Sequence, residues 1–98
     1  MNWKRALKEY RNYLVLEKAL SDNSVEAYLR DVKKLSTFCI KNKELTDCTK
    51  VSVKSIRDFI VTLHEQKSSS KSQARILSGI KSFFNYLCIE DIIEANPC

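Results

Sequence analysis

The sequence predicts an all-α domain, a compact bundle of four helices. Only one Gly and one Pro occur in 98 residues, so the residues that interrupt helices are rare. Apolar residues make up 44% of the chain, and they recur at the three- and four-residue spacing of amphipathic helices. A chain of this length suits one domain with its own hydrophobic core, so residues 1–98 are predicted to form a single domain.

Apolar stripes place the helices at about residues 3–19, 24–40, 53–66 and 71–88. The segment IEDII (89–93) is a candidate for a short fifth helix. The side chains expected in the core are Trp3, Leu7, Tyr10, Leu14, Val25, Tyr28, Leu29, Val32, Leu35, Cys39, Ile56, Phe59, Ile60, Leu63, Leu77, Ile80, Phe83, Phe84, Leu87 and Cys88.

Polar residues that can cap helices separate these segments. In the stretch LSDNS, Asn23 is a good N-cap, and Glu26 follows three residues on as in a capping box. KNKELTDCTK is predicted to be a loop, and Ser52 after it can cap the third helix. Residues 67–69 are predicted to make the next turn, with Ser70 beginning a second capping-box pattern.

A basic stretch without acids surrounds the fourth helix. Between Glu65 and Glu90 the sequence has no Asp or Glu but has four basic residues, Lys67, Lys71, Arg75 and Lys81. At about 100° per residue, the basic residues and serines of this helix fall opposite its apolar stripe. The helix N-terminus also attracts anions through unpaired N–H groups and the positive end of its dipole.

With a formal net charge of +5, this pattern predicts a helix that lies on duplex DNA. Hydroxyl groups, Lys and Arg are common donors to phosphate oxygens, and Arg can also bind guanine with two hydrogen bonds. Arg30, Lys33 and Lys34 offer a second basic face on the second helix. A solvent-exposed helix shows the same polar face without any ligand, so this second interpretation stays open.

The sequence gives little support to catalysis or metal binding. The single His, His64, has no nucleophile or ligand pattern near it, and one Gly cannot build a phosphate-binding loop. The four Cys residues include no C-x-x-C pair and are expected to be buried apolar groups or surface thiols. We therefore expect no catalytic residue, no metal and no cofactor. No apolar run suits a membrane span, and we expect a cytoplasmic protein with reduced thiols.

Two segments resemble the N-terminal core-binding domain of tyrosine recombinases of the phage-integrase type. LSDNSVEAYLRDVKKLSTFC resembles the second helix of that domain, with the pattern L-S-x-N-T, A-Y-x-x-D-L and an aromatic residue. ARILSGIKSFFNYL resembles its fourth helix, R-x-L-S-x-I-R-x-F-F-x-Y-L, and Asn96–Pro97 resembles its end. The resemblance covers nearly the whole chain, in order and at the family's spacing.

The resemblance implies a SAM-like four-helix bundle that forms half of a C-shaped clamp around duplex DNA. Its second and fourth helices would face the major groove near the strand-exchange site. Lys81 stands where Arg is common, which favours a phosphate contact there. The DNA-binding residues that the resemblance implies are Ser24, Arg30, Lys33, Ser70, Lys71, Ser72, Arg75, Ser78 and Lys81.

The resemblance also implies partners and a limit on activity. The first helix would contact other recombinase protomers in the synaptic complex, while the isolated domain is expected to be a monomer. The catalytic residues of the family belong to a second domain that this chain lacks, so we expect no DNA cleavage. A helical protein-interaction module of the death-domain or SAM type, without DNA binding, stays as the alternative, and an enzyme ranks last.

Overall fold

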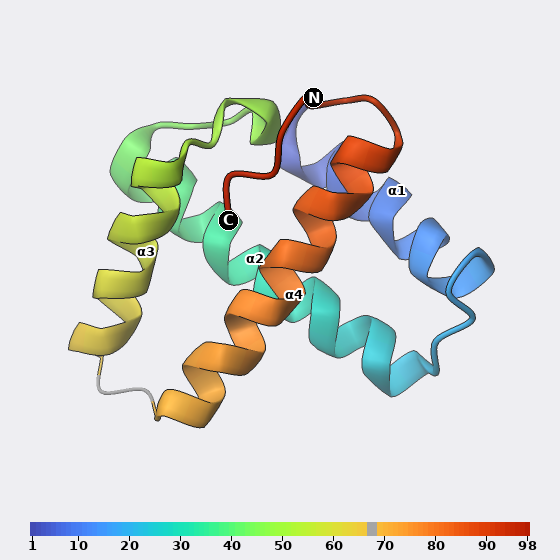
Figure 1. Cartoon of the computed structure of the whole chain (residues 1–98), viewed down its shortest axis with the longest axis horizontal. Helices are drawn as coiled ribbons and strands as arrows, with labels where there is room; N and C mark the ends of the chain where they lie inside the picture. The colour runs from blue at the N-terminus through green and yellow to red at the C-terminus, as the bar shows by residue number, and fades with distance from the viewer. Residues whose placement is uncertain (67–68) are drawn as a thin grey trace.

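The computed structural model describes residues 1–66 and 69–98, and within them it confirms the all-α bundle. Figure 1 shows α4 crossing in front of α2, with α3 on the left and α1 at the upper right. Among the described residues, α2 and α4 make the most extensive contact between two helices. The elements are α1 (Trp3–Leu16), α2 (Asp22–Lys43), the 3₁₀ helix η1 (Cys48–Lys50), α3 (Val53–Glu65) and α4 (Ser70–Ile89).

The core is rich in aromatic rings where α1 meets the C-terminal half of α4. The Phe83 ring centroid lies 5.2 Å from that of Tyr10 and 6.1 Å from that of Trp3. The Tyr10 hydroxyl donates to Ser82 Oγ at 2.9 Å, so Ser82 is turned inward rather than lying on the outer face as predicted. Trp3 is buried, and its Nε1–H donates to the Leu45 carbonyl at 3.0 Å.

The predicted core is largely confirmed, with a shift on α4. Ile76 is 3% exposed and belongs to the core, whereas the predicted Leu77 is only partly buried. Ala6 is a further core residue that the stripe on α1 did not include. The other predicted core residues that are only partly buried are Leu7, Tyr28, Ile60 and Cys88.

Several predicted helix boundaries are wrong by a few residues. Ser21 caps α2 by accepting the Ser24 N–H at 3.3 Å, so the predicted N-cap Asn23 lies inside the helix. Ser69 rather than Ser70 caps α4. Ala19, predicted as the last residue of the first helix, has a left-handed φ of 50°, and α1 has already ended. Ser52 caps α3 as predicted.

The predicted loop 41–50 is shorter than expected, because α2 continues into it and η1 forms within it. Of the turn predicted at residues 67–69, residues 67 and 68 lie outside the described part of the chain.

The predicted fifth helix does not form. Asp91 has a left-handed φ of 57°, and the Ile92 N–H donates back to the Leu87 carbonyl at 2.9 Å, which closes the end of α4. The Asn96 amide group then donates to Asn85 Oδ1 at 2.8 Å and to the Lys81 carbonyl at 3.2 Å. Residues 90–98 therefore fold back along α4, and Figure 1 shows the C-terminus between α3 and α4.

Candidate nucleic-acid interface

The N-terminal half of α4 is mostly exposed to solvent. Ser70 and Lys71 lie exposed in its first turn. Ser69 Oγ accepts the Ser72 N–H at 3.1 Å and donates to Ser72 Oγ at 3.0 Å, so the Ser72 hydroxyl takes part in the cap. This end of the helix therefore offers the Ser70 hydroxyl and the Lys71 ammonium group beside the positive end of the helix dipole.

A small cavity, the α2–α4 hollow, lies where the two helices cross. Its volume is about 220 Å³. It brings together three of the predicted DNA-binding residues, although Ser24 is far from the other two in sequence. The residues that line it are Ser24, Ala27, Tyr28, Asp31, Arg75 and Ser78.

Asp31 supplies the negative charge that the sequence around α4 lacks. Its side chain is only 3% exposed, and Arg75 Nη2 donates to Asp31 Oδ1 at 3.3 Å. The Arg75 side chain itself is 52% exposed. Burial raises the pKa of the Asp31 carboxyl above its ordinary value, while the positive charges of Arg75, Lys34 and Arg30 act in the opposite direction. The predicted DNA-reading arginine is thus paired with a buried carboxylate of α2.

Gly79, the only glycine of the chain, allows α4 to approach Asp31 closely. A Cβ atom at this position would lie 2.8 Å from Asp31 Oδ2 and 3.2 Å from Asp31 Cβ. It would also lie 3.4 Å from the ring of Tyr28. The missing side chain therefore leaves room for the carboxylate beneath α4.

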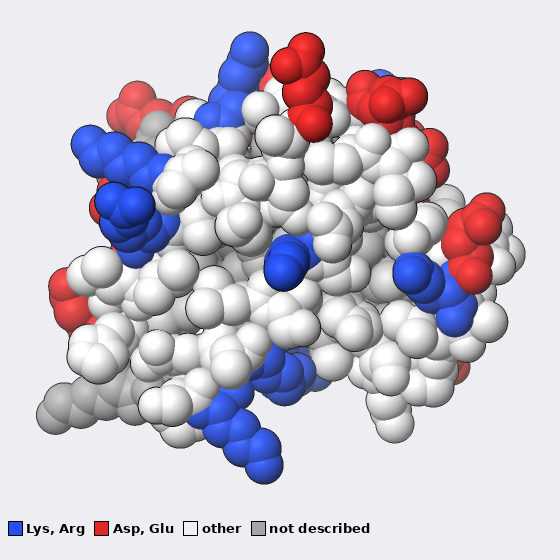
Figure 2. All heavy atoms as spheres, viewed as in Figure 1, with Lys and Arg blue, Asp and Glu red and all other residues white. Residues whose placement is uncertain are grey.

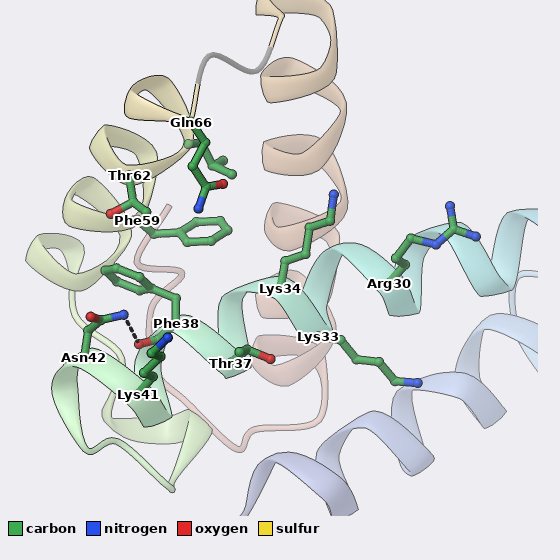
Figure 3. Close-up of a pocket in the computed structure, with 11 residues that line it drawn as sticks. Arg30, Lys33, Lys34, Thr37, Phe38, Lys41, Asn42, Phe59, Thr62 and Gln66 are labelled. Carbon is green, nitrogen blue, oxygen red and sulfur yellow. Dashed lines mark hydrogen bonds between the residues drawn. The ribbon is translucent and has the colours of Figure 1, made fainter.

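A larger groove, the α2–α3 groove, lies on the other side of α2 and is shown in Figure 3. Its volume is about 500 Å³. In Figure 3, Lys34 and Arg30 point to the same side of α2, whereas Lys33 points away from them toward α1. The predicted basic face of the second helix is therefore divided. The lining includes four cations and no acid, and its residues are Arg30, Lys33, Lys34, Thr37, Phe38, Lys41, Asn42, Phe59, Thr62, Leu63 and Gln66.

Lys81 lies further along α4, away from the α2–α4 hollow. Its exposed side chain lines one cavity with Lys18 of the loop after α1, and another with Cys98 at the C-terminus. Ser78 lines both of these cavities and the α2–α4 hollow as well. The predicted residues of α4 therefore follow one exposed side of the helix from its first turn to Lys81.

Charge is unevenly distributed on the face shown in Figure 2. Acidic side chains lie along the upper edge and at the two sides, whereas the middle and lower part shows Lys and Arg. This view is the same as in Figure 1, in which α4 crosses that part of the molecule. Phosphate groups would therefore meet the basic part of this face without facing an exposed acid.

Sequence reasoning missed Asp31 as a member of the site. Its signal was present, because Asp31 stands on the same side of the second helix as Tyr28 and Leu35, which were predicted to point inward. An ionised carboxylate on an inward face needs a charged or hydrogen-bonding partner. The identity of that partner was not readable, because Arg75 is 44 positions away in the sequence.

Residues with other chemistry do not gather into a site in the described part of the chain. His64 is exposed near the end of α3. Cys39 and Cys48 are buried, Cys88 is partly buried and Cys98 is exposed. Residues 1–66 and 69–98 include no group of three or more potential metal ligands, and none of their helices is long and apolar enough to cross a membrane.

Comparison with known proteins identifies the family. The family described as phage integrase, N-terminal SAM-like domain, matches residues 7–91. The chain is 40% identical over 96 residues to a tyrosine recombinase of Pseudothermotoga lettingae, an alignment that covers 95% of this chain and 32% of the relative. It is 34% identical over 91 residues to tyrosine recombinase XerD of Staphylococcus saprophyticus, with 93% of this chain and 30% of the relative covered.

It is also 33% identical over 91 residues to tyrosine recombinase XerC of Pseudomonas syringae pv. tomato, with the same two coverages. The chain thus spans about a third of the length of these relatives. No solved structure matches it. The match over residues 7–91 confirms the resemblance found in the sequence: the chain belongs to the phage integrase N-terminal SAM-like domain family.

Proposed function

We propose that this chain is the DNA-binding domain of a site-specific tyrosine recombinase and that it holds duplex DNA with α2 and α4. One observation carries the proposal. The exposed cations and hydroxyl groups of α4 continue across the α2–α4 hollow onto α2, and the only acid lining that hollow, Asp31, is buried and paired. A phosphate backbone lying across the hollow would therefore meet hydrogen-bond donors, while the carboxylate in the hollow is already paired.

Different residues of this surface would contact different phosphate groups. Ser70 and Lys71 sit at the N-terminus of α4, where backbone N–H groups and the dipole add to their attraction for a phosphate. Lys81 would contact a second phosphate further along the helix. On α2, Arg30 would extend the contact together with Lys34 on the same side of the helix, and Lys33, which points away from both, would add a contact on the side toward α1.

The proposal includes partners and a division between domains. Named tyrosine recombinases are about three times as long as this chain, so strand exchange would be carried out by the part that this chain does not match. The domain would bind double-stranded DNA beside other recombinase protomers. Since only one half of a clamp is present, its affinity for DNA would be modest.

The test is a titration of the 98-residue chain with a fluorescent mixed-sequence duplex, followed by anisotropy at several salt concentrations. Contacts to roughly four to six phosphates predict that log K falls with log salt at a slope of about −4 to −5. Lys71→Ala should reduce the slope by about 1 and weaken binding to every duplex. Lys8→Ala, which removes an exposed lysine of α1, is the matched control and should leave the slope unchanged.

The absence of binding even at low salt would contradict the proposal. Concentration-dependent self-association without any DNA binding would favour the protein-interaction module instead. Equal losses for Lys71→Ala and Lys8→Ala would show that DNA senses the net charge of the domain and does not select the surface of α4.

A further inference from the structure

We propose that the α2–α4 hollow reads the major-groove edge of guanine through Arg75, and that Asp31 is the positioning residue that fixes the arginine for this contact. The inference rests on the proposed DNA binding and adds a ligand group and a source of specificity to it. Three features carry it: the charge balance of the pair, the geometry of the guanidinium group and the space between the helices.

The charge balance makes Arg75 a poor phosphate anchor. The ionised Asp31 carboxylate lies within hydrogen-bonding distance of the guanidinium group and compensates its positive charge. Binding to phosphate depends mainly on positive charge and places little demand on orientation. The exposed ammonium groups of Lys71 and Lys81 meet that need, so pairing Arg75 with a carboxylate would weaken a role in phosphate binding.

The geometry of the pair instead suits a base edge. Arg carries five N–H donors in a rigid plane, and the bond to Asp31 involves only Nη2. With one corner fixed and 52% of the side chain exposed, the group can present two further N–H donors in a constant direction. The O6 and N7 atoms of guanine are two acceptors in one plane at a matching spacing.

The space around Asp31 keeps this arrangement in place. Asp31 is 2% exposed, and its carboxylate lies against the backbone of Gly79, where any Cβ atom would come within 2.8 Å of Oδ2. A carboxylate enclosed in this way has little freedom to turn, so the arginine bound to it is held as well. The position of Asp31 between the two helices also ties Arg75 to α2 and not only to its own helix.

The chemistry of the hollow discriminates between bases. Adenine offers N7 as an acceptor but places an amino donor where guanine has O6, and a guanidinium group cannot accept a hydrogen bond from it. The hydroxyl groups of Ser24 and Ser78 line the hollow and can either donate or accept. Arg75 is therefore the lining residue that separates guanine from adenine.

The experiment compares two guanine-rich duplexes in anisotropy titrations with the 98-residue chain. In the second duplex every guanine is replaced by 7-deazaguanine, which removes the N7 acceptor and keeps the phosphates and base pairs. We expect wild type to bind the unmodified duplex about five-fold more tightly. Arg75→Lys keeps the charge but lacks the planar pair of donors, so its preference for the unmodified duplex should be smaller than that of wild type. Lys71→Ala should weaken binding to both duplexes and keep the wild-type ratio of the two affinities.

Asp31→Asn separates positioning from a merely structural role. It removes the compensating charge, so binding to the 7-deazaguanine duplex should become tighter and its salt slope steeper, while the preference for guanine disappears. A variant that has only lost structure would bind both duplexes more weakly. Far-ultraviolet circular dichroism checks that the variant is folded, and Arg75→Lys gives the same comparison with Asp31 in place.

Two results would overturn the inference. The first is equal affinity of wild type for the unmodified and the 7-deazaguanine duplex. The second is a wild-type preference for the unmodified duplex that Asp31→Asn or Arg75→Lys leaves unchanged. In either case the measured affinity would still support DNA binding by the domain. No binding to either duplex would instead overturn the proposed function, and the two failures are thus distinguishable.

Discussion

The two halves of α4 differ in what surrounds them. In the C-terminal half, Phe83, Phe84 and Leu87 are fully buried against α1 and the rest of the core. In the N-terminal half only Ile76 and Gly79 are buried, and the remaining contact with α2 includes the ion pair between Arg75 and Asp31. One continuous helix thus carries an apolar half that holds the bundle together and a polar half that faces solvent.

Under the proposed function, this difference would place most of the stability in one half of α4 and DNA binding in the other. The free energy of unfolding depends mainly on apolar burial, which the C-terminal half supplies. Substitutions in the exposed N-terminal half should therefore change binding with little effect on stability. Gly79 lies at the boundary between the two halves. Its lack of a side chain lets α4 pack closely against α2 and leaves room for the Asp31 carboxylate.

The largest effect is expected for Phe83→Ala. Phe83 is fully buried and contacts the rings of Trp3, Tyr10 and Phe84. Its removal should lower the free energy of unfolding by about 3–5 kcal/mol, as is typical of buried aromatic residues. Urea unfolding followed by circular dichroism measures the change. Leu77→Ala, at a partly buried position on the same helix, should cost clearly less, and equal losses would contradict the comparison.

Gly79→Ala should have an intermediate effect. Insertion of a methyl group into a packed contact lowers the free energy of unfolding by about 1–3 kcal/mol. Replacement of a glycine inside a helix by alanine raises it by about 1 kcal/mol. We therefore expect a net loss of about 1 kcal/mol in the free energy of unfolding, with displacement of the Asp31 carboxylate. Ser78→Ala, at the preceding exposed position, is the control. A higher free energy of unfolding for Gly79→Ala would contradict the close contact, in which an added Cβ atom lies only 2.8 Å from Asp31 Oδ2.

Two aspartates should respond to pH with opposite signs. Burial raises the pKa of Asp31, so the folded state binds its proton more tightly than the unfolded state does. Wild type should therefore gain stability relative to Asp31→Asn as the pH falls from neutral to about 4, the ordinary pKa of Asp. A constant difference between the two proteins over this range would contradict the burial of an ionised carboxylate.

Asp47 supplies the comparison. Hydrogen bonds from the hydroxyl group and backbone N–H of Thr49, with the N-terminal ammonium group, lower the pKa of Asp47 to about 2. Its stabilising contribution is complete above about pH 4 and is lost as the pH falls toward 2. Wild type should therefore lose stability relative to Asp47→Asn in that range, as measured by urea unfolding at each pH.

The smallest effect on stability is expected for Lys71→Ala. Lys71 is exposed in the first turn of α4, and surface substitutions of this kind change the free energy of unfolding by less than about 0.5 kcal/mol. The same variant should weaken DNA binding in the salt titration. A loss of free energy of unfolding as large as that of Gly79→Ala would show that the exposed N-terminal half of α4 also contributes to stability.

Local patterns predicted the four α-helices of the described residues and their order. The stripe of Val25, Leu29, Val32 and Leu35 is sufficient to identify α2 and its buried face. The caps were harder, because LSDNS offers several residues that can cap a helix equally well, and the structure selects Ser21. The prediction of a fifth helix was wrong because a left-handed residue, Asp91, ends α4. Glycine is the usual residue at such a position, and without one the sequence did not indicate the helix end.

Which residues of α4 share an exposed side was predictable from the sequence, but which residues of α2 lie beside them was not. Helical spacing was enough to place Arg75 and Ser78 on one exposed side of α4. The hollow they share with Ser24 depends on how α2 and α4 cross, and that crossing depends on contacts between residues far apart in sequence. The basic face predicted on the second helix grouped Lys33 with Lys34, although adjacent residues of a helix lie about 100° apart around its axis. Figure 3 shows the two side chains pointing to different sides of α2.

The return of the C-terminal segment along α4 has a mechanical consequence. Asn96 is joined by two hydrogen bonds to the backbone of Lys81 and the side chain of Asn85, and the Cys98 N–H is joined in turn to Asn96 Oδ1 at 2.9 Å. The segment is therefore fastened to the same helix whose first half carries Lys71 and Arg75. A tilt of α4 would therefore move residues 96–98 together with Lys71 and Arg75.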